Sequence, residues 1–156
     1  MIDHEPDERA KSHFRWKAAL WAGLGVGAIF IFLSRGIPWS SMGFGTSAMG
    51  RELPINSTPT YFIVNSFVHM LLSVIYAFVI GRVVFRFDIA TAVVTGAILG
   101  VVLYGLNFMV FHYGFGLGDA NEFPVAANHF FFGMMSAAAY KAFSVPRVQE
   151  QPPANP

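Results

Sequence analysis

Four long apolar runs divide the chain, and they predict four helices. The runs cover residues 16–34, 60–81, 89–112 and 125–144. Each approaches or exceeds the roughly 20 residues that a helix needs to cross a hydrocarbon core about 30 Å thick. None alternates with period two, as barrel strands do. Because backbone groups in lipid must be hydrogen-bonded internally, the pattern predicts an all-α membrane protein, a bundle of four transmembrane helices.

The composition favours the same class. Of the 156 residues, 54% are hydrophobic and only 12% are charged, whereas ordinary soluble domains carry roughly 25% charged residues. A chain this short cannot bury so many large apolar side chains in one water-soluble core. The net charge of +1 gives no reason to expect a nucleic-acid partner. The absence of cysteine excludes disulfides and thiolate metal sites.

Charged and polar segments flank the four runs. We divide the chain into a polar cytoplasmic tail over 1–15, a four-helix transmembrane domain over 16–145 and a disordered cytoplasmic tail over 146–156. The last segment contains "QEQPPANP", which has the composition of a solvated tail.

The basic residues predict the orientation. Arg35 and Arg51 follow the first run, and the other Lys and Arg residues fall on the opposite side of the predicted membrane. Those residues are Arg9, Lys11, Arg15, Lys17, Arg82, Arg86, Lys141 and Arg147. By the positive-inside rule, we expect a multi-pass protein of the cell inner membrane with both termini cytoplasmic. The linkers over 35–59 and 113–124 then face outward.

The two halves of the chain resemble each other. The first and third runs each carry a GxxxG spacing, and the outer linkers carry "GFG" followed by "ELPI" or "EFPV". The second and fourth runs each carry an Asn with a Ser eight residues later. We interpret this order as two parallel helix-loop-helix repeats, related by an axis along the membrane normal. The alternative is chance recurrence of Gly, Phe and Pro. The glycines, which we expect at helix contacts, are Gly23, Gly27, Gly96 and Gly100.

Polar residues inside the runs form stripes at helical spacing. An unpaired amide or imidazole in hydrocarbon costs on the order of several kcal/mol. We therefore expect the stripes to face other helices or a wet cavity, in the outer half of the bundle. The predicted intramembrane cluster comprises Asn65, His69, Ser73, Tyr76, Asn107, His112, Asn128, His129, Ser136 and Tyr140.

The histidines leave three interpretations open: hydrogen bonding between helices, a metal or haem site, and a proton or solute path. His69 and His129 would lie at depths that differ by about 9 Å of helical rise, which is awkward for two ligands of one iron. A metal site near the outer surface would use His112, His129 and Glu122, with Asp119 as a fourth ligand. We assign no cofactor.

The chain resembles a family of small bacterial inner-membrane proteins, the YagU-like proteins. The resemblance is carried by "AGLGVGAIF", the linker "IPWSSMGFGTSAMG", the segment "FVHMLLSVIYAFV" and the glycine-rich "GAILGVVLYGLNF". It implies a bacterial inner membrane, and it transfers no catalytic residue.

No pattern of catalytic residues stands out. There is no Ser/His/Asp arrangement and no pair of carboxylates within the apolar runs, so we do not expect an enzyme. We expect a structural or accessory subunit of a membrane assembly, with the lipid bilayer and either further copies of the chain or a larger complex as partners. The first alternative is a small oligomeric transporter or channel, with a path through Asn65, His69, Asn107 and His129. The second is a haem- or metal-binding membrane protein.

Overall fold

The computed structural model describes residues 13–33, 59–110 and 122–145, and within them the chain forms four helices. The helices are α1 (Trp16–Leu33), α2 (Pro59–Val84), α3 (Ile89–Phe108) and α4 (Glu122–Ser144). The predicted all-α fold with four helices is confirmed. Residues 1–12 and 146–156 of the two tails, and both predicted outer linkers apart from their helical ends, lie outside the described residues.

The helix ends depart from the apolar runs by a few residues. α2 continues to Val84, past the predicted end at 81, and a short turn then leads into α3. Asp88 caps α3: its Oδ1 accepts a hydrogen bond from the Thr91 backbone N–H (3.0 Å), and its Oδ2 accepts one from the Thr91 hydroxyl (2.6 Å). These bonds favour the carboxylate and lower the pKa of Asp88, so the ionised cap stabilises the fold above the usual carboxyl pKa of 3.8 and is lost as the pH falls below it.

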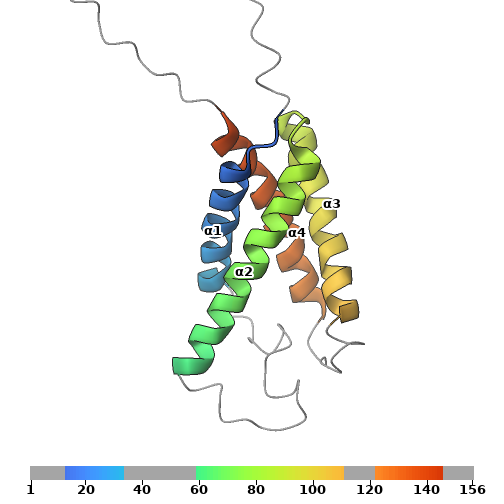
Figure 1. Ribbon diagram of the computed structural model, residues 1–156. Helices are drawn as coiled ribbons and strands as arrows, with labels where there is room; N and C mark the ends of the chain where they lie inside the picture. Colours follow the sequence, from blue (N-terminus) through green and yellow to red (C-terminus); the bar gives the residue numbers. More distant parts are fainter. Residues whose placement is uncertain (1–12, 34–58, 111–121, 146–156) are drawn as a thin grey trace, which may run out of the picture.

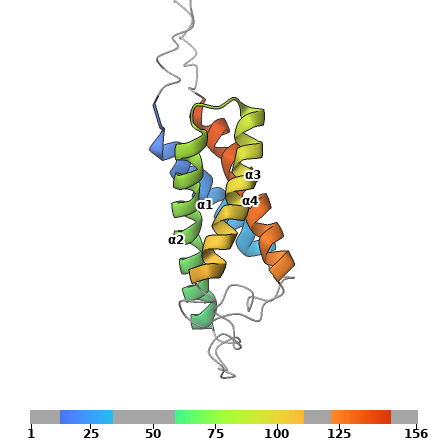
Figure 2. The ribbon, with the colours of Figure 1, turned by 90° about the vertical axis from the view of Figure 1, so that its right-hand side faces the viewer.

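The helices form an up-and-down bundle. α1 and α3 begin, and α2 and α4 end, at the same end of the molecule (Figure 1). α1 packs against α2 and α4, and α3 packs most closely against α4. α2 contacts α4 across the bundle and meets α3 over a smaller area; Figure 2 shows α2 and α3 from the side.

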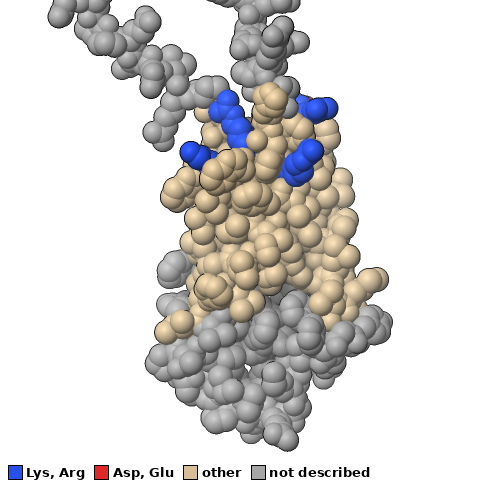
Figure 3. All heavy atoms as spheres, viewed as in Figure 1, with Lys and Arg blue, Asp and Glu red and all other residues tan. Residues whose placement is uncertain are grey.

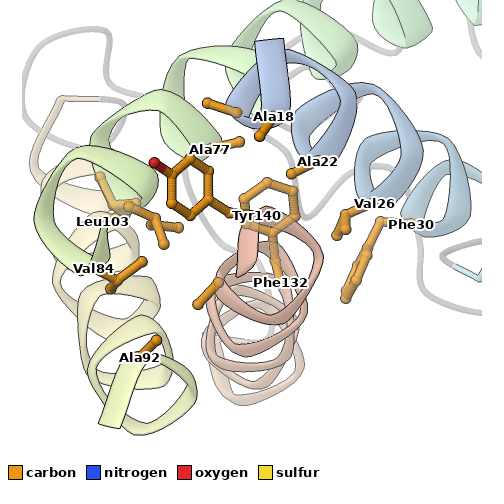
Figure 4. Close-up of a cluster of buried hydrophobic side chains, with 13 residues drawn as sticks. Ala18, Ala22, Val26, Phe30, Ala77, Val84, Ala92, Leu103, Phe132 and Tyr140 are labelled. Carbon is orange, nitrogen blue, oxygen red and sulfur yellow. The ribbon is translucent and has the colours of Figure 1, made fainter. Parts of the chain in front are cut away.

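Small side chains fill much of the interior. Ala19, Ala22, Ala77, Ala92 and Ala137 are completely buried. Larger residues from several helices converge on them (Figure 4). Phe30 of α1 meets Phe132 of α4 edge to face, with ring centroids 5.8 Å apart. A core so rich in alanine lets helix backbones come close, and the bulkier side chains are left for the outside.

Glycine brings the backbones of α3 and α4 into contact. A Cβ atom at Gly96 would lie 2.5 Å from both the Ala137 Cβ and the Gly133 carbonyl oxygen. A Cβ at Gly133 would lie 2.9 Å from the Cα of Gly100. Real Cβ atoms essentially never come within 3.0 Å of such neighbours. Only a residue without a side chain therefore fits at these positions.

The α1–α2 contact uses glycine in the same way. A Cβ at Gly23 would lie 2.7 Å from the Cα of Val74, and one at Gly27 would lie 2.7 Å from the Cβ of Ser73. The four glycines of the two GxxxG spacings thus lie at the two helix-pair interfaces. By contrast, Gly25 and Gly105 face open space, with nothing within 4 Å of an added Cβ.

The outer surface of the bundle is strongly apolar. Along α2, Phe67 is 69% exposed and Leu71 is 51% exposed, and Ile63, Ile75, Val79 and Val83 are exposed as well. The segments Ser66–Val84 and Ile89–Phe108 are long and apolar enough to cross a membrane. Trp16–Ile31 is a shorter apolar helix. Isolated exposed apolar residues are ordinary, but continuous faces of this kind mark contact with lipid or with another protein.

Basic side chains gather at one end of the bundle (Figure 3). They come from the start of α1, the end of α2 and the turn after it, and the end of α4. In the part of the chain that the structure describes, the Lys and Arg residues are Arg15, Lys17, Arg82, Arg86 and Lys141.

The glycine contacts generate a first prediction. We expect Gly100→Ala to lower the free energy of unfolding by about 1–3 kcal/mol, because its Cβ would collide with the His129 backbone. Gly105→Ala, on the same helix, is the matched control and should leave stability unchanged or raise it by up to about 1 kcal/mol through helix propensity. Unfolding in mixed micelles measures both variants. Equal effects of the two substitutions would contradict the close contact.

Candidate functional site

A hydrogen-bonded chain joins three helices in the interior. Tyr76 of α2 donates its hydroxyl proton to Oδ1 of Asn107 on α3. Nδ2 of Asn107 in turn lies 2.8 Å from Nε2 of His129 on α4. All three side chains are partly buried. The Asn107 amide of α3 therefore links α2 to α4. We call Tyr76, Asn107 and His129 the polar triad.

The orientation of the Asn107 amide, with Oδ1 facing Tyr76 and Nδ2 facing His129, decides which nitrogen of His129 carries a proton. An amide nitrogen donates hydrogen bonds and does not accept them, so Nε2 of His129 is the acceptor in this contact. A neutral imidazole that accepts at Nε2 carries its proton on Nδ1. The arrangement thus selects one neutral tautomer and uses both polar atoms of the Asn107 amide.

Aromatic rings surround the triad. Tyr104 of α3 meets the His129 ring edge to face, with centroids 5.7 Å apart. The Tyr76 ring lies 6.4 Å from His129 and 6.4 Å from Phe132. Rings in this position keep water away, and hydrogen bonds in such a low-dielectric setting are electrostatically stronger than in water.

His69 makes a different contact. Its Nε2 donates to the carbonyl oxygen of Gly27 on α1, at 3.1 Å. Gly27 has no side chain to shield its carbonyl, so the imidazole of the neighbouring helix can reach it. Two of the three histidines of the predicted cluster lie in the described part of the chain, and they connect different helices: His69 joins α2 to α1, and His129 joins α4 to α3.

The remaining predicted residues are distributed along the bundle. Ser73 is buried against Gly27 at the α1–α2 interface, and Asn128 is half-buried on α4. Ser136 is also buried, and its hydroxyl oxygen has no hydrogen-bond partner among the described residues. His112, Asp119 and the side chains of Asn65 and Glu122 lie outside the described part of the structure.

Tyr140 lies apart from the triad, at the basic end. Its hydroxyl oxygen accepts a hydrogen bond from the Arg15 backbone N–H (3.2 Å), and its ring stacks on Phe14 with centroids 5.8 Å apart. The structure therefore places Tyr140 in a contact that includes Phe14 and Arg15 of the segment we assigned to the polar tail. Sequence reasoning missed Phe14, because one aromatic residue in a charged segment has no periodic pattern around it.

The predicted metal site remains a prediction. Among the residues that the structure describes, no group of three His, Cys, Asp or Glu residues is placed to hold a metal ion. The predicted set of His112, His129 and Glu122 falls partly outside those residues. Within them, Nε2 of His129 is engaged by Asn107.

Comparisons with protein-family models, curated proteins and solved structures give no match for this chain. The resemblance to the YagU-like proteins therefore stays a prediction. Any function has to be argued from the geometry of this chain alone.

The polar triad generates a second prediction. A double-mutant cycle with Tyr76→Phe and Asn107→Ala should give a coupling energy of about 0.6 kcal/mol, the average for hydrogen bonds between membrane helices, and at most about 1.7 kcal/mol. The control pairs Tyr76→Phe with Val94→Ala, an exposed residue of α3, and should be additive within about 0.5 kcal/mol. Unfolding free energies in mixed micelles provide the measurement. Additivity of the first pair would show that the Tyr76–Asn107 bond contributes nothing to stability.

Proposed function

We propose that this protein is a multi-pass membrane protein with four membrane-spanning helices, and that it acts as a structural or accessory subunit of a membrane assembly. The membrane location rests on one observation: the distribution of apolar and polar side chains is the reverse of that in a soluble protein. Large apolar residues cover the outside, whereas the polar groups of Tyr76, Asn107, His129 and His69 bond to neighbouring helices inside. That distribution suits hydrocarbon as the solvent.

The distribution of charge supports the proposed orientation. The described basic residues lie at the end where α1 begins and α4 ends. By the positive-inside rule this end is cytoplasmic, and both termini are then cytoplasmic as well. Trp16, beside Lys17 at the start of α1, is 53% exposed and suits an interfacial position.

Equivalent contacts support an internal duplication. Gly23 packs against Val74, which lies nine residues after Asn65, and Gly96 packs against Ala137, which lies nine residues after Asn128. The second glycine of each pair also contacts corresponding positions in the two halves. Gly27 approaches Met70 and Gly100 approaches Gly133, each five residues after the corresponding Asn. These two contacts are related in the same way in both helix pairs, which supports the duplication, whereas the nearest neighbours of Gly27 and Gly100, Ser73 and His129, are not at corresponding positions.

The internal contacts favour a subunit role over an open path. His69, Tyr76, Asn107 and His129 each direct polar atoms at a group on another helix. Between α3 and α4 the backbones touch at Gly100 and Gly133, which leaves no room for a solute there. In this proposal the polar groups determine which helices pack together. The apolar outer faces are available to lipid and to other subunits.

A proton or solute path is the second candidate, favoured by one observation. His129 is an ionisable group held inside the bundle by hydrogen bonds that join three helices, and ionisable groups within membrane segments mark proton or solute paths. Reconstitution into liposomes discriminates between the two functions, because a path would release a proton or ion gradient and a subunit would not.

The apolar outer face generates a third prediction. Leu71 lies halfway along α2 and is exposed, so Leu71→Lys should place a charge at the membrane centre, at a cost of roughly 3 kcal/mol. We expect less protein in the membrane pellet after alkaline extraction. Phe87→Lys, in the turn at the basic end, is the control and should behave as wild type. Release of the wild-type protein by the extraction, with better solubility of Leu71→Lys, would contradict the membrane proposal.

The subunit role generates a fourth prediction. In mild detergent, the protein should migrate in a complex of defined stoichiometry, heavier than the 17.2 kDa chain. Asn107→Leu should reduce the amount of this complex, because α2, α3 and α4 lose their common partner. Native mass determination and liposome flux, measured on the same preparation, test the proposal. A monomer that dissipates a gradient, with Asn107→Leu abolishing the flux, would favour the path instead.

A further inference from the structure

A shallow groove runs along α2 at the basic end of the bundle. It has a volume of about 430 Å³ and is lined by Phe14, Phe78, Val79, Arg82 and Val83. Phe78 and Arg82 are four residues apart, as are Val79 and Val83, so the four form two neighbouring ridges along the helix. The groove is therefore widely open and lies against this face of α2, and Phe14 is its one lining residue from outside that helix.

Phe14 is held in place by aromatic contacts. The Phe14 ring stacks on Tyr140 and meets Phe78 and Phe85 edge to face, with centroids 6.0 and 6.5 Å away. Tyr140 is itself only 1% exposed, and its hydroxyl binds the backbone of Arg15. The groove is thus formed by side chains that already have fixed partners.

The surface of the groove is almost entirely apolar, and positive charge lies beside it. Arg82 is its one charged lining residue, and its guanidinium lies over the Phe85 ring, 5.0 Å from the centroid. Arg86 approaches the same ring at 5.1 Å. Both side chains are exposed. Asp88 is the one acidic residue near this end in the described part of the chain, and Thr91 already donates two hydrogen bonds to it.

We propose that this groove is a binding site for an acidic phospholipid of the cytoplasmic leaflet. The first part of the acyl chain lies along Phe78 and Val79, and the phosphate is bound by Arg82, with Arg86 beside it. This inference rests on the proposed membrane location. A guanidinium matches the geometry of a phosphate, and basic pockets at the cytoplasmic ends of membrane helices suit acidic head groups.

The depths of these residues match those of a lipid molecule. Arg82 lies near the end of α2, where the head groups would be. Val79 is three residues deeper, about 4.5 Å at 1.5 Å per residue, and Phe78 is about 6 Å deeper. A free phosphate would use only the charged end and would leave the apolar part empty. The shape of the groove therefore favours an amphiphile over a soluble anion.

Native mass spectrometry of the full chain in mild detergent tests the site, with phosphatidylglycerol and phosphatidylcholine of identical acyl chains as probes. We expect phosphatidylglycerol to bind more tightly. Arg82→Gln should reduce this preference about fivefold, the factor that corresponds to the roughly 1 kcal/mol that one basic residue contributes near an anionic surface. Lys17→Gln is the matched control, because it removes one charge at the same end outside the groove.

A second variant separates the groove from general charge attraction. Val79→Trp keeps every basic residue and fills the apolar part, so it should weaken binding of both lipids. Inorganic phosphate at the same concentration should not compete. Equal loss of preference in Arg82→Gln and Lys17→Gln, or wild-type binding in Val79→Trp, would overturn the site. The membrane proposal would survive those results, since alkaline extraction tests it separately.

Discussion

The contact between the α3 and α4 backbones at Gly96, Gly100 and Gly133 is the constraint on which the rest of the bundle depends. Each glycine occupies a point where a side chain would overlap the opposite helix. Because the two backbones touch, Asn107 and His129 come within 2.8 Å of each other, and Asn107 can then reach across to Tyr76 of α2. A separation larger by one methyl group would stretch the Asn107–His129 hydrogen bond, which is 2.8 Å long in the structure.

The sequence alone was enough to locate the helices. Their apolar runs are long and unbroken, and a helix is the one regular structure of that length that satisfies its own backbone groups. It was less informative about their ends. The end of α2 at Val84 and the start of α3 depend on the turn that Asp88 caps, which is a local hydrogen-bonding effect and not a matter of hydropathy.

The sequence predicted which residues belong to the candidate site, but not which of them contact each other. Helical spacing indicates that Tyr76, Asn107 and His129 share the inner faces of their helices. Which of them meet depends on the heights and tilts of three helices, and no local pattern encodes these. Tyr140 illustrates the difference: it follows the same stripe as Ser136, but its hydroxyl is bound at the basic end by Arg15. The position of Phe14 likewise depends entirely on tertiary contacts with Tyr140, Phe78 and Phe85.

The central position of Asn107 has a consequence for the direction of the polar triad. The two ends of an amide are nearly equal in size and opposite in hydrogen-bonding character. A half-turn of this group about its Cβ–Cγ bond would present the nitrogen to Tyr76 and the oxygen to His129. Tyr76 would then accept a hydrogen bond instead of donating one, and His129, with its proton moved from Nδ1 to Nε2, would donate instead of accepting, while all three helices stayed where they are. The backbone contacts fix the positions of the three groups, but the sense in which they share protons is reversible.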